Sequence, residues 1–424
     1  MADPADELNQ AQEERPALPS LWRNRDYMLM WSGQMVSVFG SSLSFVALPL
    51  IILKISGSPA QAGLVEALFA VPWLFFSLPA GAYVDRWDRK RVMIICNFVF
   101  GAGMGAITLA YFTSHLAMYQ FYVIAPVMGT MMVLFNLSET SALPRVVPKE
   151  QLPTASAQNE AVQATAGLAG PPLGGFLYGT IGPVVPFLFD AITYLVSAVA
   201  LAFVRTTFQE DREPAQDRNL RREILEGLTW LWQHPLIRFM AFLVGGINFG
   251  NAATGLILIV IARHQGTPAA FIGLMFSIAA AGGLLGAIIA PRIQRRFSFG
   301  QVIITTTAIG SLTWPIYALA PNFVILGAAF AIGFLCTPVF NAVQFAYRLA
   351  LIPDELQGRA NSSFRLLAFG FQPLGAALGG ALLQSIGPRP TVLVFFAVNL
   401  FLTALTAANA HVRRAPPISA VHAN

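Results

Sequence analysis

Long runs of apolar residues alternate along the chain with short segments that hold most of its charged residues. An α-helix needs about 20 apolar residues to cross the ~30 Å hydrocarbon core of a bilayer. Measured against that length, the runs predict an all-α membrane protein with about twelve transmembrane helices. Their expected positions are 27–53, 60–84, two helices within 92–138, 155–180, 184–204, 238–262, 269–291, two helices within 297–347, 360–385 and 390–411.

The composition agrees with a chain whose surroundings are lipid. Hydrophobic residues make up 55% of the 424 residues, charged residues only 11%, and the mean hydropathy is +0.61. A soluble domain carries about 25% charged residues. The net charge of +5 does not indicate nucleic acid as a partner, because the basic residues cluster between the apolar runs, where they determine topology.

The basic residues also predict how the chain is oriented. If the N-terminus is inside, the outer turns hold only Lys54, Arg263 and Arg389, and every other Lys or Arg lies in an inner segment or at the inner end of a helix. Such an asymmetry is typical of the positive-inside rule. We therefore expect a multi-pass protein of the cytoplasmic (inner) membrane of a bacterium, with both termini cytoplasmic.

The second half of the chain repeats the first at an offset of about 205 residues. Ile352-Pro353 repeats Val147-Pro148, and Asn341 repeats Asn136. The repeat predicts two pseudo-symmetric six-helix bundles, with the substrate site near the midplane between them. The expected units are a disordered cytoplasmic tail (1–20), an N-terminal bundle (21–204), a cytoplasmic linker (205–235), a C-terminal bundle (236–412) and a second tail (413–424). In the linker, apolar residues at helical spacing indicate an amphipathic helix on the inner membrane face, although a plain solvated linker is the alternative.

Two motifs stand out. The loop after the second span contains Gly81, Asp85, Arg86, Arg89 and Lys90. The fifth span contains Gly167, Gly170, Pro171, Gly174 and Gly175.

The first motif resembles the signature loop of the major facilitator superfamily, and the second resembles the Gly-Pro-x-x-Gly-Gly motif of its drug/proton antiporters. The run from Ala142 to Tyr194 is similar to the macrolide-efflux and enterobactin-exporter branch. The resemblance implies the major facilitator fold and export of small molecules in exchange for protons. The chain departs from the best-known antiporters in two respects, because the expected fourth span has no arginine and the expected first span has no acid.

The resemblance also implies a conformational latch. Asp85 would face the positive N-terminal end of the eleventh helix, near Arg359, and Arg89 would pair with Glu139 at the inner end of the fourth span. These contacts would hold the two halves together in the outward-facing state. The alternative is a basic loop that only determines topology.

Ionisable groups within a span are costly and are candidates for a functional role. Asp190 is the deepest, and with Glu66 and Glu160 it forms the candidate set for proton coupling. A structural carboxyl, hydrogen-bonded to a neighbouring helix, is the alternative for Asp190.

In this superfamily the cavity is lined mainly by spans 1, 4, 7 and 10. Their polar residues here are Gln34, Ser37, Ser41, Thr130, Asn248, Asn251, Asn341 and Gln344. Amides beside aromatic residues, without a charge, favour a bulky amphipathic substrate. The same amides are equally compatible with hydrogen bonds between helices.

No catalytic or metal-ligand constellation and no nucleotide-binding loop is present in the sequence. We therefore expect no enzyme activity, no cofactor and no metal, and we read Cys96 and Cys336 as inert helix residues. The leading hypothesis is a monomeric exporter of drug-, macrolide- or siderophore-like molecules that uses protons. Alternatives are a carrier of a lipid or other metabolite, and a transport-inactive sensor or partner protein.

Overall fold

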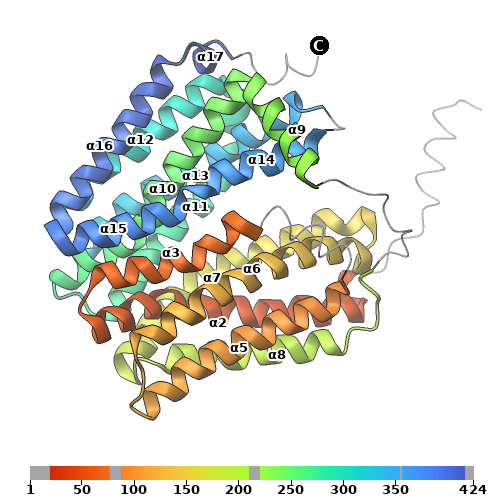
Figure 1. The fold of residues 1–424 in the computed structure, drawn as a ribbon, viewed down its shortest axis with the longest axis vertical. Coiled ribbons are helices and arrows are strands. Elements are labelled where there is room, and N and C mark those ends of the chain that lie inside the picture. The colour runs from red at the N-terminus through yellow and green to blue at the C-terminus, as the bar shows by residue number, and fades with distance from the viewer. Residues whose placement is uncertain (1–19, 77–86, 210–219, 354–355, 416–424) are drawn as a thin grey trace, which may run out of the picture.

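The computed structural model describes residues 20–76, 87–209, 220–353 and 356–415, and all regular elements within them are helices (Figure 1). The all-α expectation is confirmed. The long helices are α2 (Arg25–Ser56), α3 (Pro59–Phe76), α5 (Arg89–Phe112), α6 (Met118–Val146), α7 (Leu152–Thr180), α8 (Val185–Ala202), α10 (Pro235–His264), α11 (Ala269–Arg296), α12 (Phe299–Leu319), α13 (Phe323–Leu351), α14 (Gln357–Gly370), α15 (Gln372–Ile386) and α16 (Pro388–Ala408). The shorter ones are η1 (Leu21–Arg23), η2 (Lys149–Gln151), α9 (Leu220–Gln233) and α17 (Ala410–Arg413).

Eleven segments of the described chain are long and apolar enough to cross a membrane, and α14 and α15 together make one of them. α7 lies where the fifth span was expected and is 29 residues long, but it is not one of the eleven. Polar residues such as Gln158, Asn159 and Glu160 lower the hydropathy of its first half. In the described chain, α7 is therefore a twelfth long helical segment, less apolar than those eleven.

Local chemistry explains where several helices begin and end. The side chain of Asn24 accepts a hydrogen bond from the Tyr27 amide at 3.0 Å, which caps the start of α2. Asp88 caps α5 in the same way. At Gly57, φ is +64°, a left-handed conformation that ends α2 without steric cost.

The eleventh span is two helices rather than the single helix that the hydropathy predicts. α14 ends at Gly370, Phe371 forms a turn, and α15 begins at Gln372. Pro373 has no amide hydrogen to donate to the preceding turn, so the helix breaks there.

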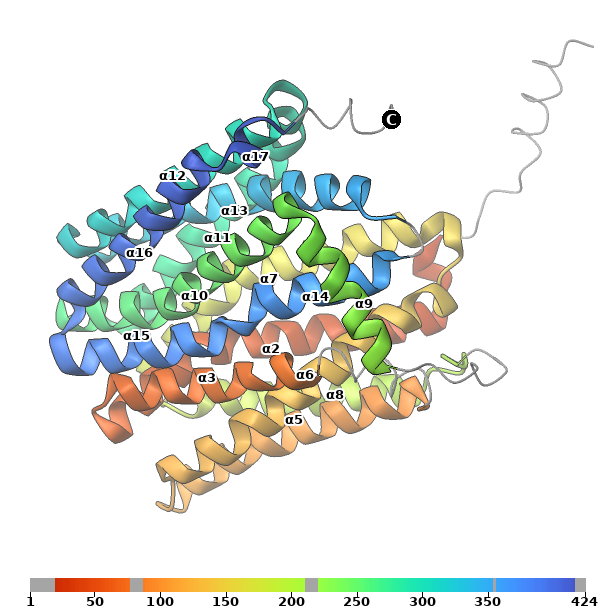
Figure 2. The same cartoon turned by 45° about the horizontal axis from the view of Figure 1, so that its top comes forward.

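The long helices form two bundles that lie against each other (Figures 1 and 2). α2, α3 and α5–α8 form the first bundle, and α10–α16 form the second. The main contacts between them are α7 against α11 and α3 against α15. Because successive helices alternate in direction, α2 begins and α16 ends on one side of the membrane, which we call the termini side. The opposite side is the far side.

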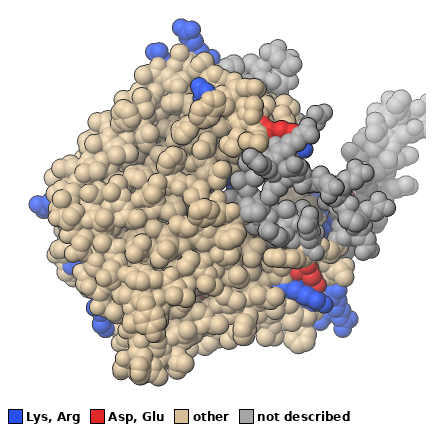
Figure 3. All heavy atoms as spheres, in the orientation of Figure 1, with Lys and Arg blue, Asp and Glu red and all other residues tan. Residues whose placement is uncertain are grey.

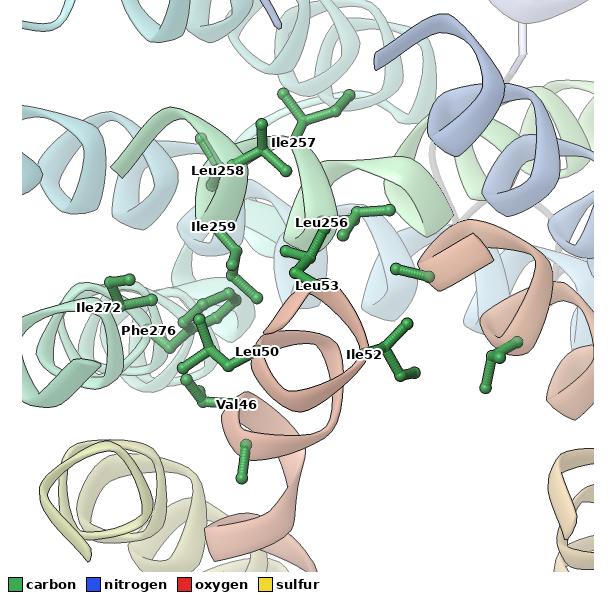
Figure 4. Close-up of a cluster of buried hydrophobic side chains, with 14 of the residues drawn as sticks. Val46, Leu50, Ile52, Leu53, Leu256, Ile257, Leu258, Ile259, Ile272 and Phe276 are labelled. Carbon is green, nitrogen blue, oxygen red and sulfur yellow. The ribbon is translucent and has the colours of Figure 1, made fainter. Parts of the chain in front are cut away.

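Apolar side chains join the two bundles on the far side. Figure 4 shows Val46 and Leu50 of α2 facing Ile259 of α10 and Phe276 of α11, all of them buried. The rings of Phe45 and Phe276 also meet edge to face, with 5.3 Å between their centroids. Apolar side chains therefore fill the contact between the two bundles on the far side.

The outer surface is largely apolar. Charged side chains lie near the edges of the face seen in Figure 3, and a wide area between them has none. Large apolar side chains are exposed, including Leu109 (65%), Phe112 (66%) and Leu319 (80%). An exposed apolar area of this extent fits a lipid environment.

The linker contains the amphipathic helix α9, which packs against α14. A Cβ on Gly227 would lie 2.4 Å from the carbonyl oxygen of Arg359, so the two backbones are in close contact. Glu226 forms an ion pair with Arg359 at 2.5 Å. α9 thus buries part of its surface on the second bundle instead of lying wholly on a membrane face.

Candidate functional site

The two bundles approach most closely where α7 crosses α11. A Cβ on Gly273 of α11 would lie 2.1 Å from the carbonyl oxygen of Pro171 in α7. Nearby, Ser277 Oγ donates a hydrogen bond of 2.5 Å to the carbonyl oxygen of Leu168. The two backbones meet directly, as they do at membrane helix crossings built from small residues.

The glycines of the Gly-Pro motif divide between two partners. Gly170 and Gly174 face α2 of the same bundle, where a Cβ would lie 2.2 Å from Ser42 Cβ and 2.1 Å from the Leu43 carbonyl oxygen, respectively. Gly175 faces α11, where a Cβ would lie 2.2 Å from the Ala269 carbonyl oxygen. Gly167 has more room, with Ala280 at 3.9 Å from its Cβ position. Through Pro171 and Pro172, α7 remains one continuous helix.

A second crossing joins α3 to α15. A Cβ on Gly63 would lie 2.5 Å from the Ala376 carbonyl oxygen, and one on Gly380 would lie 2.6 Å from the Pro59 carbonyl oxygen. Gly63 is near the beginning of α3, and Gly380 is in the second half of α15, so this crossing lies on the far side. The bundles are thus held together there by two glycine-lined crossings and the apolar cluster of Figure 4.

Of the signature loop, Gly81, Asp85 and Arg86 lie outside the described residues. Arg89 is buried and donates to the Phe208 carbonyl oxygen at 3.1 Å. Lys90 donates to the Val204 carbonyl oxygen at 2.6 Å. These two cations therefore bind carbonyl oxygens of the segment that follows α8.

Glu139 of α6 binds Gln34 of α2. The Gln34 amide nitrogen donates to the Glu139 carboxylate, and the Gln34 oxygen is buried without a partner in the described chain. Sequence reasoning assigned these residues to two different features, the cavity and the latch. The structure brings them together, and the contact recorded for the Glu139 carboxylate is Gln34 rather than Arg89.

Asp190 lies inside the first bundle, where α8 faces α2, and is 1% exposed. Ser41 Oγ lies 3.3 Å from its Oδ1 and 2.7 Å from the hydroxyl oxygen of Tyr194. The Tyr194 ring stacks on Phe100, with centroids 4.7 Å apart. A single hydroxyl thus links a buried carboxyl to a helix expected to line the cavity.

The other candidates do not join this group. Glu66 and Glu160 are exposed. The hydroxyls of Ser37 and Thr130 donate to carbonyl oxygens of their own helices, Gln34 at 3.0 Å and Pro126 at 2.8 Å.

The second bundle encloses a cavity of about 150 Å³ between α10, α12, α13 and α16. We call it the second-bundle recess. Three predicted residues, Asn248, Asn251 and Asn341, line it. The other lining groups include hydroxyls, an amide and aromatic rings: Thr306, Thr307, Ser311, Thr313, Thr337, Thr403, Asn399, Trp314, Tyr317, Phe330, Phe334 and Phe340.

None of the described residues that line the recess is charged. Some of their groups already bind within the protein: Ser311 and Thr403 share a hydrogen bond of 2.7 Å, and the Asn248 amide donates to the Ala368 carbonyl oxygen at 2.8 Å. Thr337 and Asn341 are exposed. The recess therefore offers neutral hydrogen-bonding groups beside aromatic surface, which suits a weakly polar group or ordered water.

A family model described as transmembrane secretion effector (MFS_3) matches residues 19–422. The chain belongs to this family. Its fold is that of the major facilitator superfamily.

Two efflux proteins are similar in sequence to the chain over most of its length. The multidrug efflux pump Tap of Mycobacterium tuberculosis is 24% identical over 398 residues, which cover 91% of this chain and 93% of Tap. Macrolide efflux protein A of Streptococcus pyogenes is 26% identical over 382 residues, covering 86% and 91% of the two chains. Among solved structures, a bacterial homologue of the iron transporter ferroportin in an inward-facing state has a TM-score of 0.70 at 16% identity, covering 92% of this chain and 99% of that chain.

Sequence reasoning missed several polar side chains in this member of the MFS_3 family. Most hydroxyls of the recess lie on α12 and α16, which belong to the spans that were not expected to line the cavity. Thr307 and Ser311 are one helical turn apart, and this spacing was the available signal. Arg348 was also missed, because it immediately follows the charge-free run from which two spans were predicted.

Gln344 was predicted for the cavity, but it lies outside the lining of the recess. It is 7% exposed, and its amide nitrogen has no hydrogen-bond partner among the described residues.

Proposed function

We propose that the protein is a secondary active transporter that exports small amphipathic molecules by alternating access, in exchange for protons. It acts as a monomer in the cytoplasmic membrane of a bacterium, with both termini cytoplasmic. The names of its relatives, a multidrug pump and a macrolide efflux protein, support drugs and macrolides as substrates.

The observation that carries the proposal is the position of the contacts between the bundles. The α3–α15 crossing and the apolar cluster lie on the far side, and both are made of small or apolar groups without ion pairs among the described residues. Contacts of this kind separate without leaving buried charges unpaired. The pathway in this state is therefore proposed to open towards the termini side, and its far-side contacts to part when the transporter turns outward.

The second-bundle recess supports the substrate class. Aromatic rings, amides and hydroxyls without a charge accept a molecule with an apolar body and a few hydrogen-bonding groups. Proton coupling is assigned to Asp190, because its link through Ser41 connects a buried carboxyl to α2. Glu66 and Glu160 remain secondary candidates for coupling.

The test uses everted membrane vesicles that contain the full chain, with Hoechst 33342 and radiolabelled erythromycin as probes. When respiration generates a proton gradient, we expect both probes to accumulate in the vesicles, and a protonophore to abolish accumulation. Vesicles with the Gly273→Leu variant, which cannot keep the α7–α11 crossing, are the negative control. Accumulation that persists after the gradient is collapsed would contradict proton exchange, and no accumulation above vesicles without the protein would contradict export.

A further inference from the structure

Arg348 is a buried cation to which the described chain offers no hydrogen-bonding partner. It lies in the last turn of α13, is 8% exposed, and makes no ion pair or side-chain hydrogen bond with any described residue. Its Nε is fully enclosed and has no acceptor there. A buried charge is normally paired or hydrogen-bonded, so this arrangement requires an explanation.

Within the described chain, two aromatic rings lie against its guanidinium group, and no acid forms an ion pair with it. The Arg348 Cζ lies 4.2 Å from the centroid of the Phe364 ring and 5.3 Å from that of Phe345. Phe364 is 2% exposed, whereas Phe345 is 51% exposed. A second cation, the exposed Arg365 of α14, acts electrostatically on Arg348. The fold thus brings a second guanidinium group within range to repel that of Arg348.

A second unpartnered donor lies on the same face of α13. Gln344 precedes Arg348 by four residues, so the two side chains are neighbours on the helix surface. The Gln344 amide nitrogen is buried and, within the described chain, has no acceptor. Asn341, which lines the second-bundle recess, is one further turn towards the far side.

We infer that Arg348, Gln344 and Arg365 bind an anionic group, a carboxylate or a phosphate, carried by an amphipathic molecule. A guanidinium group binds such an anion through two parallel hydrogen bonds, and the Gln344 amide adds a third donor. The exposed Phe345 ring is placed to contact the apolar part of the same molecule. The anion would supply the acceptors that the described chain does not give to Arg348 and Gln344.

This inference adds a binding site to the proposed function, and the role of that site in transport rests on the proposed function. The site lies towards the termini side of the recess along one face of α13, so a molecule that enters from that side meets the cations before the recess. The proposed substrates would then include amphipathic acids. A bound anionic lipid headgroup has the same chemistry, and the test separates the two sources.

Binding is measured without transport, so that failure of the site and failure of export remain distinguishable. The purified full-length chain in dodecyl maltoside is titrated with dodecanoate and with dodecanol, and the ligand-induced rise in melting temperature is followed. Separately, retention of phosphatidylglycerol is measured by native mass spectrometry. The variants are Arg348→Gln, Arg348→Lys and Arg365→Gln, and the control is Arg295→Gln, an exposed arginine at the end of α11.

We expect dodecanoate to stabilise the protein and dodecanol not to do so. Arg348→Gln and Arg365→Gln should each weaken the binding of dodecanoate about tenfold, since each removes charge-assisted contacts. Arg295→Gln should leave the affinity for dodecanoate unchanged. Arg348→Lys, which keeps the charge but not the planar donor pair, should have a smaller effect. Loss of phosphatidylglycerol alone in the two glutamine variants would support the site with a lipid headgroup as its ligand. Unchanged binding of both probes in both variants would overturn the inference, and if Arg348→Gln does not fold, Arg365→Gln decides.

Discussion

Ser277 Oγ of α11 donates a hydrogen bond to the carbonyl oxygen of Leu168 in α7, and so ties the second bundle to the first. In an unbroken α-helix that carbonyl would accept from the amide four residues later. Here the residue four positions later is Pro172, which has no amide hydrogen. The proline pair therefore leaves a carbonyl group free within α7, and the other bundle uses it.

This relationship predicts the result of a double-mutant cycle. Ser277→Ala should lower the free energy of unfolding by about 1 kcal/mol, because it leaves the Leu168 carbonyl without a donor. In a Pro172→Ala background the loss should be smaller, since that substitution restores the missing amide hydrogen within α7. Urea unfolding of the purified protein, followed by tryptophan fluorescence, gives both values. Ser385→Ala is the control, because the Ser385 hydroxyl donates within its own helix; equal losses in the two backgrounds would contradict the pairing.

The crossing of α7 and α11 should also be sensitive to a single methyl group at Gly273. The 2.1 Å between its Cβ position and the Pro171 carbonyl oxygen means that one backbone must move in Gly273→Ala. We expect a loss of ~1–3 kcal/mol in stability. The matched control is Gly105→Ala in α5, where a Cβ would meet nothing within 4 Å; this variant should be neutral or up to about 1 kcal/mol more stable. Similar melting temperatures for the two variants would show that the bundles do not meet at Gly273.

Hydropathy predicted the positions of the helices well, because a membrane helix satisfies its backbone hydrogen bonds within its own segment and needs only sufficient apolar length. Apolar length alone is sufficient to define α10 or α13. The break between α14 and α15 was not foreseen, although Pro373 marks it. The polar first half of α7 shows the opposite limit: the run 155–180 was predicted as a span, but α7 is not among the eleven segments that are apolar enough to cross a membrane.

Side-chain partners were harder to predict, because they depend on which helices pack together. Gln34 and Glu139 were each chosen as polar residues of a central span, but nothing in either span indicates that they bind each other. Arg348 looked like an ordinary basic residue at a helix end, and only its burial against Phe364 distinguishes it. The position of Asp190 was predicted, whereas its partners Ser41 and Tyr194 required the packing of α2 on α8.

If Asp190 carries the coupled proton, Asp190→Asn should separate coupling from substrate binding. Asparagine has nearly the same shape and still accepts from Ser41, but it cannot take up and release a proton at physiological pH. We expect erythromycin uptake driven by a pH gradient in everted vesicles to fall to less than about a tenth of the wild-type rate. Exchange of labelled for unlabelled erythromycin without a gradient should continue.

The control for Asp190→Asn is Tyr194→Phe, which removes the hydroxyl that shares Ser41 but keeps the carboxyl and the ring that stacks on Phe100. It should retain gradient-driven uptake. Gradient-driven uptake at the wild-type rate in Asp190→Asn would show that Asp190 is a structural carboxyl. Glu66 and Glu160 would then be the candidates for proton coupling.

The second-bundle recess can be filled without disturbing its walls. A Cβ on Gly333 would lie 3.7 Å from the Tyr317 hydroxyl oxygen and 3.8 Å from Thr313 Oγ1, both ordinary contact distances, so a side chain at this position has room to enter the recess. Gly333→Leu should raise the KM for erythromycin about tenfold, equivalent to ~1.4 kcal/mol of lost binding, with little change in melting temperature. Gly105→Leu adds the same side chain where the structure has open space, and should leave KM unchanged. If both leucine variants transport erythromycin with the wild-type KM, the substrate does not occupy the recess, and its groups serve only to hold α10, α12, α13 and α16 together.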